Sequence, residues 1–214
     1  MKRFLGFLVM LTLVAGLSPA VMAGGGGKKQ EELPELTPEQ RAVEAYNSGI
    51  TARDKAWKLQ KKLAAANDDR ERGKLTAKIE KTYRSAAKSQ KKAVGLNPTM
   101  FEAHSELGYA LRKLGDYEAS LAAYDMALEL QPGYALAIEY RAEAYLGLGR
   151  IDDAKMAYMK LFEGQSDQAG SLLEAMQKYV ADNPNVAAFS SWVSERAEIA
   201  GQTKTISQLN DADW

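Results

Sequence analysis

Basic side chains at helical spacing carry the most pronounced chemistry in this sequence. Residues 51–92 contain fourteen lysine and arginine residues against five aspartate and glutamate residues, which gives a net charge of +9. Such a concentration of cations attracts an anionic membrane surface or a polyanion, and that binding weakens as salt is added. The same composition is also typical of solvated helix faces. The predicted basic patch consists of Lys55, Lys58, Lys61, Lys62, Arg72, Lys74, Lys78 and Lys81.

Catalytic and metal-binding patterns are missing from the sequence. It has no cysteine and one histidine, and it lacks the GxSxG, phosphate-loop and HExxH motifs. His104 occupies a position that the helical repeats described below fill with apolar side chains, so we expect it to be packed rather than to act as a base. The sequence therefore predicts a protein that is not an enzyme and that binds no cofactor or metal.

The C-terminal part of the chain is acidic. Residues 100–214 hold nine basic and eighteen acidic side chains, a net charge of −9, and the whole sequence has a formal charge of zero. A neutral protein has no overall field that favours nucleic acid, so none is expected as a partner. The division of charge between two regions favours head-to-tail attraction between copies, which makes a homo-oligomer an alternative prediction.

The N-terminus has the three parts of a secretory signal peptide. Two basic residues precede an apolar stretch over 4–17, and Val21-Met22-Ala23 is a small-residue cleavage site, so we expect residues 1–23 to be removed. This predicts export across the inner membrane into a bacterial periplasm, with anchoring by an uncleaved signal as the alternative. Without cysteine, the chain has no residue to carry the lipid of a bacterial lipoprotein. Residues 24–37 begin with four glycines and predict a flexible leader.

Residues 38–98 predict an extended helical hairpin. Thr37 can cap its first helix and Pro38 suits the first turn, while an Asn-Asp-Asp sequence at 67–69 marks the turn before the second helix. The hairpin is longer than the helix pairs that follow it, so it should protrude beyond them. Small residues on the first helix allow its partner to approach closely. That stripe consists of Ala42, Ala45, Gly49, Ala52, Ala56, Leu59, Leu63 and Ala66.

A period of 34 residues organises the chain beyond the signal. Tyr83, Tyr117 and Ile151 recur at this step, and so do Pro98 and Pro132. The period equals the length of one helix-turn-helix repeat. It predicts that each copy contributes two antiparallel helices, with prolines and glycines at the connections.

The period also divides the second half of the chain. We predict two helix pairs in 99–165 and two closing helices in 166–201, the last of which Gly201 ends. Residues 202–214 are predicted to form a tail that is loose or weakly docked.

The residues at fixed positions within the period identify a family. Leu107, Gly108, Leu111, Ser120, Tyr124, Ala127 and Pro132 follow the spacing W-x2-L-G-x2-Y…A-x3-F…A…P. The chain thus resembles the tetratricopeptide repeat family, as an exported bacterial member, over about 41–163. The resemblance implies an all-α fold, a short helical solenoid in which the hairpin at 38–98 is a split and extended repeat.

The resemblance also implies a binding groove lined by the first helix of each pair. The implied groove residues are Ser105, Tyr109, Arg112, Glu139, Glu143, Leu146, Tyr46, Ile50 and Arg53. The implied function is a non-catalytic protein–protein interaction or scaffold module of the cell envelope, which binds a segment of another envelope protein. The alternative is binding of an anionic surface or polyanion, or self-association, through the basic hairpin at 51–92.

Overall fold

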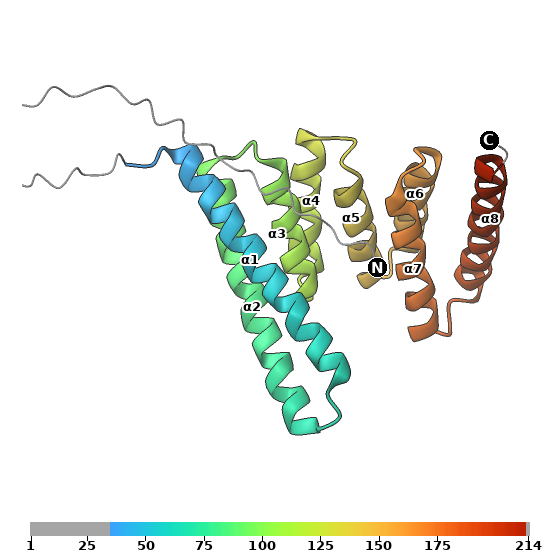
Figure 1. The fold of residues 1–214 in the computed structure, drawn as a ribbon, viewed down its shortest axis with the longest axis horizontal. Coiled ribbons are helices and arrows are strands. Elements are labelled where there is room, and N and C mark those ends of the chain that lie inside the picture. The colour runs from blue at the N-terminus through green and yellow to red at the C-terminus, as the bar shows by residue number, and fades with distance from the viewer. Residues whose placement is uncertain (1–34, 213–214) are drawn as a thin grey trace, which may run out of the picture.

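A computed structural model describes the backbone of residues 35–212 and the side chains of residues 35–202. The predicted signal peptide and residues 24–34 of the predicted leader lie outside the described part. Within residues 35–212 the chain forms helices and no strand, which confirms the all-α solenoid (Figure 1). The helices are α1 (Pro38–Ala65), α2 (Asp69–Leu96), α3 (Phe101–Lys113), α4 (Tyr117–Leu130), α5 (Ala135–Gly147), α6 (Ile151–Glu163), α7 (Asp167–Asp182) and α8 (Ala187–Ala212).

The hairpin of α1 and α2 extends beyond the other helices, as its length predicts (Figure 1). Its start has a complete capping box, because Thr37 accepts a hydrogen bond from the Gln40 N–H and the Gln40 side chain accepts one from the Thr37 N–H. At the tip, the Asp68 side chain caps α2 by accepting from the Glu71 N–H. The two helices approach closely because the buried face of α1 is made mostly of small residues. Those buried residues are Ala42, Ala45, Gly49, Ala56 and Leu59.

Close helix crossings explain the glycines that recur at one position of the repeat. A Cβ atom on Gly108 would lie 2.7 Å from Cε1 of Tyr124, so only glycine allows α3 to cross α4 here. The hairpin has the same arrangement, since a Cβ on Gly49 would lie 2.3 Å from Nε2 of Gln90. Gln90 and Tyr124 are 34 residues apart and both are fully buried. The hairpin therefore packs as a repeat that has been lengthened at its tip.

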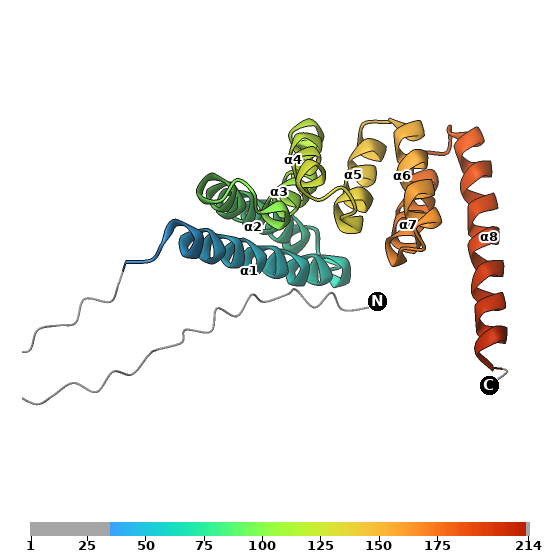
Figure 2. The ribbon, with the colours of Figure 1, turned by 90° about the horizontal axis from the view of Figure 1, so that it is seen from above.

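The helices form two layers, which Figure 2 shows from above. The first helices of successive pairs, α1, α3, α5 and α7, contact one another in chain order and form what we call the inner layer. Each second helix contacts its partner and the first helix of the next pair, whereas α2, α4 and α6 make no comparable contact with one another within the described chain. The first helices therefore lie closer to one another than the second helices do, and the closest packing is within the pairs α1/α2 and α3/α4.

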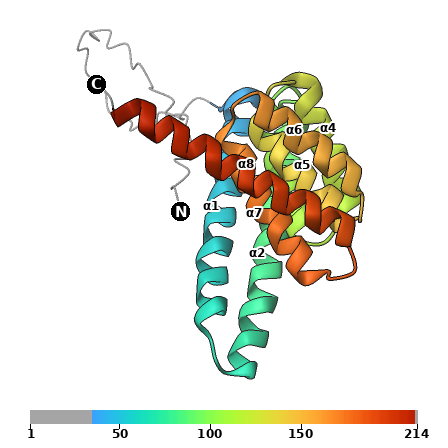
Figure 3. The same cartoon turned by 90° about the vertical axis from the view of Figure 1, so that its right-hand side faces the viewer.

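The closing pair differs from its prediction in one respect. Helix α8 lies across the end of the solenoid and continues through Gly201 to Ala212 (Figure 3). The prediction that Gly201 ends this helix is therefore wrong, and residues 202–212 are helical instead of a loose segment. Trp214 lies outside the described residues. A glycine within a helix costs only about 1 kcal/mol relative to alanine, and no proline follows to stop the helix. Among the described residues, no helix has the length and apolar character needed to cross a bilayer.

Candidate functional site

The nine predicted groove residues come from three neighbouring helices of the inner layer, but most of them do not face solvent. Ser105, Tyr109, Arg112, Glu139 and Leu146 are buried. Ser105, Tyr109 and Glu139 line no pocket described below, so the prediction that they face out of a groove is wrong. Their cover comes from neighbouring inner helices, which bring aromatic and charged side chains over the same positions. Tyr46, Ile50 and Arg53 of α1 and Glu143 of α5 are half-buried.

Tyr109 is the centre of the buried cluster. The indole Nε1–H of Trp57 donates a hydrogen bond of 2.5 Å to the Tyr109 hydroxyl, and the two rings meet edge to face with centroids 6.0 Å apart. The rings of Tyr83 and Tyr140 lie 6.2 and 5.0 Å from that of Tyr109. Tyr109 thus connects α1, α2, α3 and α5, and its main role is to hold the hairpin against the repeats.

An ion pair reinforces the same junction. The Arg53 guanidinium of α1 binds the Glu106 carboxylate of α3 and also lies 3.0 Å from the Asp54 carboxylate. Burial raises the pKa of Glu106, and the positive charge of Arg53 acts in the opposite direction. Since Arg53 already has two carboxylate partners, it is committed to joining the two helices.

A second ion pair joins α3 to α5. Arg112 binds Glu143, and its guanidinium lies 5.2 Å from the ring centre of Tyr109 and 5.4 Å from that of Tyr140. Glu139 lies one turn before Glu143. Burial raises the pKa of Glu139 to about 8, the neighbouring Glu143 carboxylate acts in the same direction, and Arg112 opposes them. Glu139 therefore carries its proton at neutral pH and is a hydrogen-bond donor as well as an acceptor.

The accessible part of the inner layer is a pocket of about 360 Å³ at the C-terminal ends of α3, α5 and α7. Cations and carboxylates line it together with two tyrosine rings. Arg112, Glu143 and Leu146 are the predicted groove residues that reach this pocket. Sequence reasoning missed Lys113, Tyr117, Gly147, Ala175, Lys178, Tyr179 and Asp182. Most of them lie in the last two turns of α3, α5 or α7. A position near the end of a first helix is the sequence feature that could have identified them.

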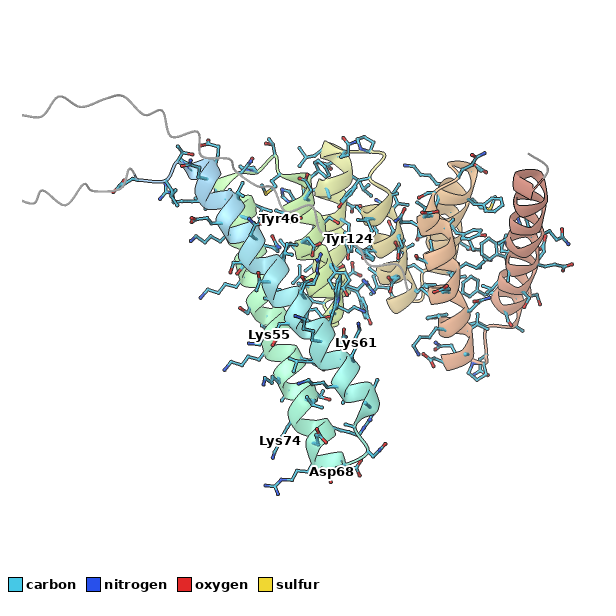
Figure 4. The ribbon with its side chains drawn as sticks, in the orientation of Figure 1. Tyr46, Lys55, Lys61, Asp68, Lys74 and Tyr124 are labelled. Carbon is cyan, nitrogen blue, oxygen red and sulfur yellow. The ribbon has the colours of Figure 1, made fainter. Side chains whose placement is uncertain are left out.

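The residues of the predicted basic patch have three different environments. Lys55, Lys78 and Lys81 line a groove of about 630 Å³ between α1 and α2. Arg72 instead stabilises the tip, because its Nη1–H donates to the backbone carbonyls of Leu63 and Ala66. Lys58, Lys61, Lys62 and Lys74 are exposed on the hairpin but do not line the groove. Figure 4 shows Lys55, Lys61 and Lys74 along the hairpin toward Asp68 at its tip.

The predicted packing of His104 is confirmed. Its side chain is buried, and Nε2 lies 2.9 Å from the carbonyl oxygen of Pro98. Among the residues that the structure describes, no three histidine, aspartate or glutamate side chains are placed to hold a metal ion.

A comparison with protein-family models agrees with the repeat architecture. Residues 101–134, which comprise α3, α4 and the following turn, match the tetratricopeptide repeat model. No curated protein matches the chain. Among solved structures, the TPR2B domain–pHsp70 complex of yeast Sti1 is similar over 73% of this chain and 98% of that chain, with 16% sequence identity and a TM-score of 0.42.

The match covers the best-formed helix pair, and the same crossing geometry recurs at Gly49 of the preceding pair. Stacked helical repeats present extended surfaces for binding other proteins, and this chain is such an interaction module. Residues 101–134 thus form a tetratricopeptide repeat.

Proposed function

We propose that the pocket at the C-terminal ends of α3, α5 and α7 binds a segment of a partner protein, and that the chain acts as a non-catalytic scaffold of the bacterial cell envelope. The observation that carries the proposal is the origin of the pocket walls, which come from three successive helix pairs. A surface assembled from several repeats recognises an extended or helical segment better than a small compact ligand.

The charges of the pocket indicate what kind of segment fits. Lys113 and Lys178 supply cations, while Glu143 and Asp182 supply carboxylates, and the ring of Tyr179 adds an apolar surface. Glu143 and Asp182 already have partners in Arg112 and Lys178. We therefore propose a segment that carries both charge signs and at least one apolar side chain, rather than a peptide held by its terminal carboxylate alone.

The cellular location is a further part of this proposal. The signal-like sequence of residues 1–23 supports export, and the absence of cysteine from the whole chain suits an oxidising compartment. A partner in the periplasm or at the inner-membrane surface would then meet the solenoid directly.

Site-specific crosslinking in intact cells tests the pocket. A photoreactive amino acid at Lys178, an exposed pocket residue, should give a discrete adduct with the partner. The matched position is Met126 on α4, which is 42% exposed and lies away from the pocket. The same adduct from both positions, or an adduct from Met126 alone, would show that the pocket is not the binding site.

Charge reversal provides a second measurement once the adduct is identified. Lys113→Glu with Lys178→Glu should weaken binding of the purified partner about tenfold or more, since each lost attraction is replaced by repulsion. Lys160→Glu with Lys155→Glu makes the same charge change on α6, away from the pocket. Equal effects of the two double variants would contradict recognition at the pocket.

A further inference from the structure

The groove between α1 and α2 combines cations and hydroxyl groups in a regular arrangement. Its eight lining residues form one stripe on each helix, with the steps of three and four that place side chains on one face. The α1 stripe is Ser48, Thr51, Ala52 and Lys55, and the α2 stripe is Lys78, Lys81, Thr82 and Ser85. Because the helices are antiparallel, the lysines of both stripes meet at the end nearer the hairpin tip, and hydroxyls continue the groove toward α3.

The three groove lysines are not neutralised by this chain. Lys55, Lys78 and Lys81 form no ion pair with any described residue, and no acidic residue lines the groove. The nearby carboxylates are committed elsewhere, since Glu80 binds Arg84 and Asp54 binds Arg53. Three ammonium groups around one hollow repel one another, and an anion placed between them relieves that repulsion.

The hydroxyl groups of the groove differ in whether they can donate to a ligand. Thr82 is buried and its hydroxyl donates to the Lys78 carbonyl over 2.7 Å, while the Thr51 hydroxyl donates to the Asn47 carbonyl over 2.9 Å. The exposed Ser85 hydroxyl has no hydrogen-bond partner among the described residues. A rotatable hydroxyl beside ammonium groups is suited to donating to an anionic oxygen.

We propose that this groove is a binding site for a linear oligophosphate. Phosphate oxygens provide several closely spaced negative charges, which matches cations on both walls of one groove. No aromatic side chain lines the groove, so it has no platform for the bases of a nucleic acid. A narrow chain that lies along the groove contacts the lysines of both walls at once.

The charge stripe continues toward the hairpin tip. Lys58 and Lys62 follow Lys55 at steps of three and four on α1, and Lys74 precedes Lys78 by four on α2. At 1.5 Å of rise per residue, the α1 lysines from Lys55 to Lys62 span about 10 Å toward the hairpin tip. A linear anion with several phosphates therefore meets more cations than a single phosphate does. Since the whole chain has a formal charge of zero, this attraction comes from the local arrangement.

Calorimetric titration of the full chain with tripolyphosphate tests the proposal, with orthophosphate as the single-phosphate comparison. Tripolyphosphate should bind more tightly, and the affinity should fall as salt is added. The combined variant Lys55→Gln, Lys78→Gln and Lys81→Gln should bind about a hundredfold more weakly, from about fivefold for each lysine. The control variant Lys61→Gln, Arg70→Gln and Lys91→Gln makes the same charge change outside the groove and should lose less than about threefold.

Amide chemical shifts provide a measurement that does not depend on a variant. On addition of tripolyphosphate, the largest changes should fall within 48–55 and 78–85. Equal losses of affinity in the two triple variants, or shift changes spread evenly over the hairpin, would overturn the groove as a site. Absence of binding at low salt would do the same. A different result would also overturn the proposal: the wild type and the groove variant bind phosphatidylglycerol vesicles equally well, and neither binds tripolyphosphate. That result would indicate attachment to a flat anionic surface.

Discussion

The hairpin α1/α2 and the helix pair α3/α4 both cross at a glycine, but a different side chain packs against that glycine in each pair. At the crossing, Gln90 faces Gly49 in the hairpin, whereas Tyr124 faces Gly108 in the repeat. Toward its tip the hairpin buries few large side chains, and its lysines are exposed and without ion-pair partners among the described residues. In the repeats, buried tyrosines fill the contacts and the Arg112–Glu143 ion pair joins neighbouring inner helices.

This difference indicates that the repeats provide most of the stability and that the hairpin provides the exposed charges. The repeats gain stability from large buried rings, because each ring removes apolar surface from water and contacts several neighbours. The hairpin relies on close backbone approach along its alanines, which leaves the outer positions of both helices available for charge. The molecule therefore has a rigid stack of repeats from which a charged arm projects (Figure 1).

The largest expected effect on stability comes from removing a buried tyrosine of the repeat, compared with removing a leucine near the hairpin tip. Tyr124→Ala should lower the free energy of unfolding by about 4 kcal/mol, because a fully buried aromatic side chain is replaced by a cavity. Leu75→Ala, at a half-buried position near the hairpin tip, should cost about 1 kcal/mol. Urea unfolding followed by circular dichroism measures both values.

A matched control keeps the ring at this position. The buried Tyr124 hydroxyl has no hydrogen-bond partner among the described residues, so Tyr124→Phe should lie within about 0.5 kcal/mol of the wild type. Equal costs for the alanine variants of Tyr124 and Leu75 would contradict the contrast between the two regions.

The next prediction compares alanine substitutions at two glycines, which should change the free energy of unfolding in opposite directions. Gly108→Ala should lower the free energy of unfolding by about 2 kcal/mol, because its Cβ would overlap the Tyr124 ring. Gly73→Ala should raise it by up to about 1 kcal/mol, because Gly73 lies within α2 with no atom within 4 Å of the added Cβ. Thermal melts of the two single variants provide the measurement. Destabilisation by Gly73→Ala would show that the tip is packed more tightly than its open surroundings indicate.

The smallest expected effect is a pH dependence at the inner layer. The pKa of Glu139 is raised from 4.5 to about 8 in the folded chain, so the folded state binds this proton more tightly than the unfolded state. Its contribution to stability is fully present below about pH 4.5 and is lost as the pH rises through about 8. Glu139→Gln should remove this loss and stabilise the protein at pH 9 by on the order of 1 kcal/mol.

Unfolding of both proteins at pH 4 and pH 9 gives the comparison for Glu139. Arg112, Glu143 and Glu174 are the charged groups that act on it, and they are unchanged in the variant. The same stability difference at both pH values would indicate a packing effect instead of the release of a proton.

Several structural features were predictable because they depend on local sequence. The capping residue Thr37 accepts a backbone hydrogen bond as predicted, and the period of 34 residues places each helix pair. The end of α8 was not predictable in this way. A single glycine at 201 does not end the helix, because the residues on both sides of it are compatible with the helical conformation. The two grooves also needed the structure, because their walls come from different helices.

Periodicity and turn residues fixed the helix pairs, the position of the long hairpin and the separation of basic from acidic regions. These properties follow from interactions between residues close in sequence and from side-chain composition. The exposure of each inner side chain was decided by tertiary packing. Trp57 reaches Tyr109 across 52 residues, and Arg112 reaches Glu143 across 31. Repeat position alone places Tyr109 and Arg112 on the inner layer, but side chains from neighbouring helices determine whether a partner can reach them.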